Sequence, residues 1–293
     1  MALFLSAVIS GIASGVLLAL LGFGVVLLYK ATGVANFAQG ALATLGAFIC
    51  YKAGTALGLP LAVNIVLAVA ATMLLGALFY WLILRPKDDA GRLNLVIRTL
   101  GLQMLVLAVI EYLWAAGQPF PFPKIFDPGA AFALGSAAVS WDSVAIIGIA
   151  VVLGMLAYLV FRYTDIGLMF VAMSEKAEIV QMLGIRTRRL TLIAWMATAA
   201  IATVVGILLA PQALLSSDMM EPYLLLAFTA VVIGGLTSLS GVWVGGIVVG
   251  IVNNVVSLYG TSDLATFVIF ALLLAVLSFR PQGLFGHPEI ERL

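Results

Sequence analysis

The 293-residue sequence has few of the residues that soluble proteins expose or use for covalent chemistry. Charged residues make up only 9% of it, against about a quarter in an ordinary soluble domain. It has one cysteine, Cys50, and one histidine, His287, so it cannot form an internal disulfide or a metal site built from several such residues. The net charge of +1 gives no basic face for nucleic acid. These shortages exclude a disulfide-stabilised secreted domain and a nucleic-acid-binding protein.

The dipeptide Gly-Lys is also missing from the sequence. A Walker A loop needs that pair before a serine or threonine, because the lysine and the loop amides hold the nucleotide phosphates. We therefore expect that the chain does not hydrolyse ATP and binds no cofactor of its own. If its function depends on ATP, a separate subunit must supply the ATPase.

Apolar residues, by contrast, make up 64% of the chain, and the mean hydropathy is +1.22. A helix needs about 20 apolar residues to cross the hydrocarbon core of a membrane. We predict an all-α, polytopic transmembrane bundle of about eight spans, plus a short or broken helix at 223–236, in a single domain over residues 1–293. Strands are not expected, because the apolar runs do not alternate as barrel strands do. The predicted spans are 6–29, 34–51, 61–84, 99–117, 144–161, 190–210, 242–259 and 264–279.

The basic residues predict the orientation of this bundle. Twelve of the fourteen lysines and arginines fall on one side if 223–236 crosses the membrane, and only Lys52 and Lys124 fall opposite. Because cytoplasmic loops are rich in basic residues, the N-terminus is predicted outside and the C-terminus in the cytoplasm. If 223–236 only dips into the membrane, the bias weakens. With the N-terminus outside, loop 117–142 is predicted to be external and loop 163–189 internal.

The internal loop contains the pattern of a short helix at 174–183. Ser174 is expected to cap its start, Glu175 and Glu178 favour its first turn, and Gly184 is expected to end it. Such a helix could dock an ATPase subunit. The pattern alone equally allows an ordinary solvated connector.

Four polar residues inside the apolar runs are candidates for lining a substrate pathway: Gln103, Glu111, Asn253 and Asn254. A carboxylate inside a span is costly, so Glu111 is expected to face protein or water. Its place in the outer half of its run favours a structural role near the interface. Asn253 shares a helical face with Gly246, Gly250 and Ser257, and Asn254 lies beside that face, which favours close helix packing over a pathway.

Two further polar segments interrupt the apolar pattern. Asn36–Gly40 predicts a helix start near the inner membrane surface, with Asn36 as the N-cap and Gln39 reaching back as in a capping box. The segment GGLTSLSG at 234–241 is a polar break between two apolar runs. It predicts either a tight interhelical turn or an interrupted helix beside a transport pathway.

Several segments together resemble the membrane subunit of branched-chain amino acid ABC importers, the LivH/LivM family, and are closer to LivH. Gln39 stands where the family usually has histidine, and Arg98 where it has alanine. The similar segments follow in the expected order over nearly the whole chain. They are GVLLALLGFG at 15–24, VANFAQG at 34–40, RTLG at 98–101, VIGGLTSLSG at 232–241 and RPQGLFG at 280–286.

The resemblance implies a permease subunit in the bacterial inner membrane. It would form the translocation pathway for branched-chain or other hydrophobic amino acids, or for a related small molecule. Its partners would be a homologous LivM-like permease, two ATPase subunits that use ATP and Mg, and an extracytoplasmic substrate-binding protein. The internal loop would be the element that couples to the ATPase, through Ser174, Glu175, Ala177, Glu178, Gly184 and Ile185.

Three other classes of membrane protein remain as alternatives. An ion-coupled secondary transporter needs titratable groups in the membrane, and Glu111 is the only carboxylate well inside a run. A passive channel would conduct without ATP. A membrane-embedded enzyme ranks last, because the spans contain no paired nucleophile and base.

Overall fold

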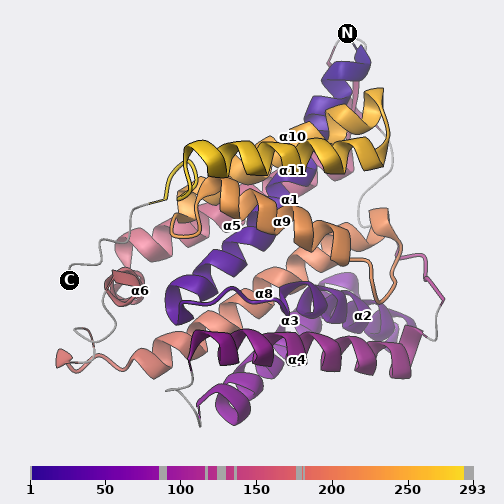
Figure 1. Ribbon diagram of the computed structural model, residues 1–293. Coiled ribbons are helices and arrows are strands. Elements are labelled where there is room, and N and C mark those ends of the chain that lie inside the picture. Colours follow the sequence, from indigo (N-terminus) through magenta and orange to yellow (C-terminus); the bar gives the residue numbers. More distant parts are fainter. Residues whose placement is uncertain are drawn as a thin grey trace. The chain divides into compact units, whose positions relative to one another are not determined.

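The computed structural model describes residues 2–85, 91–115, 118–123, 130–134, 137–175, 180 and 182–286, which are helical apart from one β-hairpin (Figure 1). Two helices end as short π-helical segments, η1 (Tyr80–Leu84) and η3 (Glu111–Ala115). The α-helices are α1 (Ala2–Thr32), α2 (Gln39–Leu57), α3 (Leu61–Phe79), α4 (Arg92–Ile110), α5 (Trp141–Tyr163), α6 (Asp165–Glu175), α8 (Thr187–Ala213), α9 (Glu221–Gly234), α10 (Leu239–Tyr259) and α11 (Ser262–Phe279).

Eight helices in the described part of the chain are long and apolar enough to cross a membrane. Each overlaps one of the eight predicted spans, so the all-α, polytopic fold class is confirmed. The ninth run forms α9, whose 14 residues have a length of about 21 Å at 1.5 Å per residue. That is shorter than the roughly 30 Å of hydrocarbon in a bilayer. Its full crossing of the membrane therefore stays a prediction.

Loop 117–142 contains the one pair of β-strands among the described residues. Strands β1 (Ala130–Leu134) and β2 (Ala137–Ser140) form an antiparallel pair in which Leu134 lies opposite Ala137. The expectation concerned the apolar runs, whose described residues form no strand, and this strand pair lies outside them. The two residues between these strands are Gly-Ser, a sequence typical of short hairpins.

The chain packs as two compact units, each discontinuous in sequence. The first consists of Met1–Val26, Lys124–Gly154 and Leu225–Leu293, and the second of Leu27–Pro123 and Met155–Leu224. Helices α1, α5 and α9 each continue from one unit into the other. No single cut in the sequence separates the two units, and the assignment of one domain to residues 1–293 stays a prediction.

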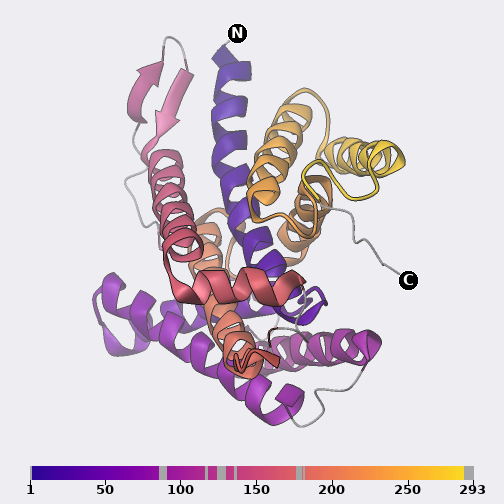
Figure 2. The same cartoon turned by 90° about the vertical axis from the view of Figure 1, so that its left-hand side faces the viewer.

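In the second unit, α8 packs closely against α2 and α3 (Figure 2). Gly206 of α8 faces the backbone carbonyl of Ala43 in α2, and Gly46 of α2 faces the side chain of Thr203 in α8. The buried hydroxyl groups of Thr203 and Thr72 in α3 form a hydrogen bond of 2.6 Å. Small residues let helix backbones approach, and the hydroxyl pair satisfies polar groups away from water. Helix α8 is therefore the element that holds α2 and α3 together.

In the first unit, α1 and α10 make a similar glycine-lined contact. A Cβ added to Gly15 would lie 2.7 Å from the carbonyl oxygen of Gly246, so no larger residue fits at that point. About two turns further along α10, the side-chain amide of Asn254 donates to the hydroxyl of Ser14 at 2.7 Å. The small and polar face of α10 thus packs against α1, as favoured from the sequence.

The polar break at 234–241 is a tight turn between α9 and α10. Gly235 has a φ of +109°, and the Ser238 hydroxyl accepts a hydrogen bond from the Gly241 amide, which starts α10. The segment after α11 packs on this turn: the amides of Leu284 and Phe285 donate to carbonyls at the end of α9, at 2.8 and 3.1 Å. Two separate segments of the sequence, 232–241 and 280–286, therefore form one structural element. The interrupted-helix alternative is not needed for this segment.

We predict that Gly206→Ala lowers the thermal stability of the purified protein, because the added Cβ meets the Ala43 backbone. Overpacking of this kind costs roughly 1–3 kcal/mol. Gly101→Ala in α4 is the matched control, because a Cβ there has nothing within 4 Å. Thermal unfolding in detergent measures both variants. Equal melting temperatures for the two would contradict the close α2–α8 contact.

Candidate functional site

A fully buried polar pair lies just before and at the start of α2. Asn36 and Gln39 both have 0% of their surface exposed. The Asn36 side-chain amide donates to the Gln39 side-chain oxygen at 3.2 Å, and the Asn36 side-chain oxygen accepts from the Ala38 amide at 3.0 Å. The Gln39 side chain in turn donates to the backbone carbonyl of Thr198 in α8 at 3.2 Å. We call Asn36, Gln39 and the Thr198 carbonyl the polar node.

The node differs from the predicted cap. Helix α2 begins at Gln39 with Ala38 in the N-cap position, so Asn36 is not the N-cap and Gln39 does not close a capping box. Instead, the two side chains bond to each other, and the Gln39 side chain also bonds to α8. The prediction failed because it considered only local partners, whereas Gln39 bonds to a residue 159 positions away.

The node also places the start of α2 beside the middle of a neighbouring helix. Thr198 lies near the middle of the 27-residue helix α8. The first turn of α2 shares a cavity with Gln103, which lies at the middle of the candidate span Leu93–Trp114. The predicted position at the inner membrane surface stays a prediction, and α2 begins beside the middle of α8 and shares a cavity with the second half of α4. Such a start is tolerated inside a membrane only where protein or a water-filled cavity satisfies the backbone.

The cavity beside this helix start has a volume of about 440 Å³ and is open on one side. Three parts of the second unit form it: the first turns of α2, the second half of α4 with η3, and the segment that leads into α9. Its lining residues are Gly40, Ala41, Thr44, Gln103, Leu107, Ala108, Glu111, Ser217, Asp218, Met220, Glu221 and Leu224.

The chemistry of the cavity is acidic at its polar positions and apolar elsewhere. Glu111, Asp218 and Glu221 contribute three carboxylates, and no basic residue occurs among the described lining residues. Gln103 adds a side-chain amide. The remaining wall is mainly aliphatic. A few directed polar groups on an apolar wall are typical of small-molecule sites.

The structure brings two of the four predicted pathway residues together and leaves the other two elsewhere. Gln103 and Glu111 line this cavity. Asn253 and Asn254 belong to α10 in the first unit, where Asn254 bonds to α1 and to the Gly250 carbonyl of its own helix. The geometry of Asn254 is that of a residue that joins two helices.

Sequence reasoning missed four polar residues of the cavity: Thr44, Ser217, Asp218 and Glu221. Asp218 and Glu221 flank the start of α9, and so had the appearance of ordinary polar residues outside an apolar run. No signal in the sequence indicates that these residues lie near Gln103. They line the same cavity because the segment that precedes α9 packs beside α2 and α4.

The internal loop is partly described. Ser174 lies in the last turn of α6, where its hydroxyl donates to the Val171 carbonyl at 2.8 Å, so its predicted role as an N-cap is wrong. Helix α6, in which Ser174 lies, begins at Asp165, after Thr164, whose hydroxyl accepts from the Gly167 amide at 3.2 Å. Residues 176–179 and 181 of the predicted helix at 174–183 lie outside the described residues. The Ser174 hydroxyl also accepts from the Lys30 ammonium at 3.4 Å.

The predicted end of this segment is confirmed. Gly184 has a φ of +80°, and the Ile185 amide donates to the Val180 carbonyl at 3.2 Å, the hydrogen bond of a Schellman helix end. Ala177 and Glu178 lie outside the described residues, as does the side chain of Glu175.

The fold and the cavity together define a multi-pass membrane permease. Residues 7–277 match the family model described as branched-chain amino acid transport system / permease component, and the chain belongs to that family. The family forms the permease subunits of ABC transport systems and has no ATPase activity. The chain is thus a transport subunit rather than an enzyme, as the resemblance implied.

Relatives in this family align with the chain over nearly its full length. The high-affinity branched-chain amino acid transport system permease protein LivH of Salmonella typhimurium is 29% identical, with 99% of this chain and 98% of the relative aligned. The permease protein BraD of Pseudomonas aeruginosa is 24% identical over the same shares. A probable LivH of Methanocaldococcus jannaschii is 26% identical, with 92% and 89% aligned.

The cavity predicts a clear difference in accessibility between adjacent residues of α4. In a Cys50→Ser background, Gln103→Cys should react with a charged thiol reagent in the assembled transporter. Leu102→Cys should not, because only 5% of Leu102 is exposed and a thiol buried among apolar groups is inert. Labelling followed by mass spectrometry measures both. No reaction at Gln103→Cys would show that the cavity is not accessible to water, and rapid reaction at Leu102→Cys would contradict the burial of that side chain.

Proposed function

We propose that this chain forms, with a homologous permease, the pathway by which an ABC importer moves hydrophobic amino acids across a bacterial inner membrane. The observation that carries the proposal is the cavity beside the start of α2, next to the middles of two spans. Discontinuous helices at mid-membrane depth often form the substrate sites of transporters. The relatives LivH and BraD, both named as branched-chain amino acid permeases, support the class of substrate.

The lining of the cavity fits the three parts of a hydrophobic amino acid. The carboxylates of Glu111, Asp218 and Glu221 attract the ammonium group. The first turn of α2, at Gly40 and Ala41, presents the positive end of a helix dipole to the substrate carboxylate. The aliphatic wall accepts the side chain. No ion needs to be co-transported, because the ATPase subunits supply the driving force.

The proposed assembly contains a LivM-like permease, two ATPase subunits that use ATP and Mg, and an extracytoplasmic binding protein. The N-terminus is outside and the C-terminus in the cytoplasm, as the basic residues favour. The coupling element is the internal loop, with Ser174, Glu175, Ala177, Glu178, Gly184 and Ile185. Asn253 and Asn254 would act on the pathway through helix packing rather than by contact with substrate.

Reconstitution tests the proposal as a whole. Proteoliposomes that contain the permease pair and the ATPases should take up leucine only with binding protein outside and ATP inside. Uptake without ATP would favour a channel, and uptake driven by a proton or sodium gradient would favour a secondary transporter.

The three carboxylates predict a graded response to neutralisation. Glu111→Gln should retain most transport, with KM raised by no more than about five-fold, because one exposed charge contributes roughly 0.2–1 kcal/mol. The triple variant Glu111→Gln/Asp218→Asn/Glu221→Gln should lose most transport. Asp263→Asn, outside the cavity, is the control. Complete loss with Glu111→Gln alone would assign that residue an essential role, and normal transport by the triple variant would exclude the cavity.

The coupling element predicts a difference between two glycines with similar backbones. Gly184 and Gly58 have φ values of +80° and +63°, and a Cβ on either meets nothing within 4 Å. Alanine at each should therefore cost a similar 1–2 kcal/mol or so in backbone strain. Only Gly184→Ala should lower the amount of substrate moved per ATP hydrolysed. Equal coupling ratios in the two variants would contradict the assignment.

A further inference from the structure

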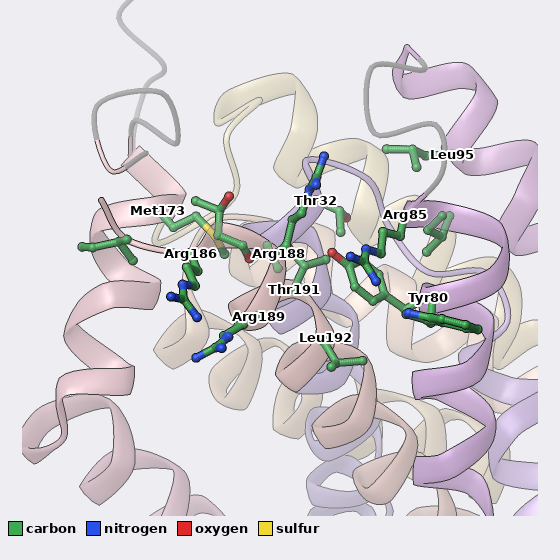
Figure 3. A pocket seen from close by; sticks show the side chains of 15 residues that line it. Thr32, Tyr80, Arg85, Leu95, Met173, Arg186, Arg188, Arg189, Thr191 and Leu192 are labelled. Carbon is green, nitrogen blue, oxygen red and sulfur yellow. Dashed lines mark hydrogen bonds between the residues drawn. The ribbon is translucent and has the colours of Figure 1, made fainter. Parts of the chain in front are cut away.

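A second cavity in the second unit is surrounded by arginines. It has a volume of about 770 Å³, and Arg85, Arg186, Arg188 and Arg189 contribute four guanidinium groups to its lining. No acidic residue occurs among the described lining residues. Figure 3 shows three of the arginines at the start of α8 and Arg85 on the helix across from them. Arg85, Arg186 and Arg189 are exposed.

The ends of four candidate spans meet at this cavity. The spans Leu3–Thr32 and Leu61–Leu84 end there, with Thr32 and Leu84 in its lining. The spans Leu93–Trp114 and Thr187–Ala213 begin there, with Leu95 and Thr187 in its lining. Ends of membrane spans lie at the level of the lipid headgroups. The cavity is therefore an opening between helices at one membrane surface.

The start of α8 adds to the positive field of the arginines. Arg186 is in the N-cap position and makes no side-chain capping bond, and the first turn that follows is part of the cavity wall. The N-terminus of a long helix and several guanidinium groups both favour a phosphate.

The remaining wall is mostly apolar, with polar groups also from Thr32, Tyr80, Thr187 and Thr191, and it continues onto exposed apolar side chains. Trp81 lines the cavity and is 56% exposed, and the next residues of η1, Leu82 and Ile83, are also exposed. Tryptophan is enriched where membrane proteins meet lipid headgroups. A soluble anion needs no such wall, whereas a phospholipid places its phosphate at the arginines and its acyl chains along these side chains.

We propose that this cavity binds the headgroup of an anionic phospholipid, such as phosphatidylglycerol, through Arg85, Arg186 and Arg189. Basic pockets between membrane helices are known to take anionic lipid headgroups. This site is separate from the acidic cavity, and it does not depend on which substrate the transporter carries.

Native mass spectrometry of the purified transporter complex tests the proposal. The delipidated complex is titrated with phosphatidylglycerol or with phosphatidylcholine, and the bound lipids are counted. Arg85→Gln/Arg189→Gln should weaken phosphatidylglycerol binding on the order of 30-fold. Arg85→Lys/Arg189→Lys should recover most of it, because the charges remain. The matched control is Arg162→Gln/Arg280→Gln, which removes two basic residues outside this cavity.

Three results would overturn the proposal. Equal affinity of the glutamine variant and the control would show that the arginines hold no lipid. Displacement of the lipid by millimolar inorganic phosphate would assign the cavity to a soluble anion. Loss of the ATPase subunits with unchanged lipid binding would assign it to subunit docking. If the double glutamine variant elutes as an aggregate, Arg186→Gln replaces it, and unchanged lipid affinity in that variant would also contradict the site.

Discussion

The hydrogen bonds of the polar node are the constraint on which the functional part of this structure depends. A helix that begins at the depth of its neighbours' midpoints has backbone groups that lipid cannot satisfy. The Asn36 side chain satisfies the Ala38 amide just before the helix, and the bond from Gln39 to the Thr198 carbonyl fixes the start of α2 against α8. The acidic cavity lies beside this first turn.

Helix α8 connects the two sites of the second unit. Its first turn is part of the arginine-lined cavity, its middle accepts the Gln39 bond, and its second half packs against α2 and α3 through Thr203 and Gly206. Helix α8 is one continuous helix of 27 residues, with Pro211 close to its C-terminal end, so its first turn and the Gln39 bond are joined by unbroken helix. Lipid or ATPase contacts near Arg186 can therefore influence the helix start beside the substrate cavity.

The sequence predicted the spans well because apolar length alone decides them. The glycine face of α10 was also predictable from local sequence, because its small residues recur at helical spacing. The helix end at Gly184 was predictable because helices often end at a residue with a positive φ, which glycine adopts without strain. The node and the acidic cavity were not predictable in this way. Gln39 looks like a capping residue until its partner in α8 is known, and Asp218 looks like a loop residue until the segment packs beside Gln103. Such sites arise from contacts between distant parts of the chain.

A reversible cross-link between the start of α2 and α9 tests most directly the claim that the cavity beside α2 is part of the substrate pathway. A Cβ on Gly40 would lie 3.5 Å from the Cβ of Leu224, within the distance that a disulfide spans. In a Cys50→Ser background, Gly40→Cys/Leu224→Cys should form a disulfide in membranes. ATP-driven leucine uptake should then stop and return on reduction, because the walls of the pathway must move during transport. Failure of the cross-link would contradict the position of the α2 start, and full transport by the cross-linked protein would contradict the role of the cavity.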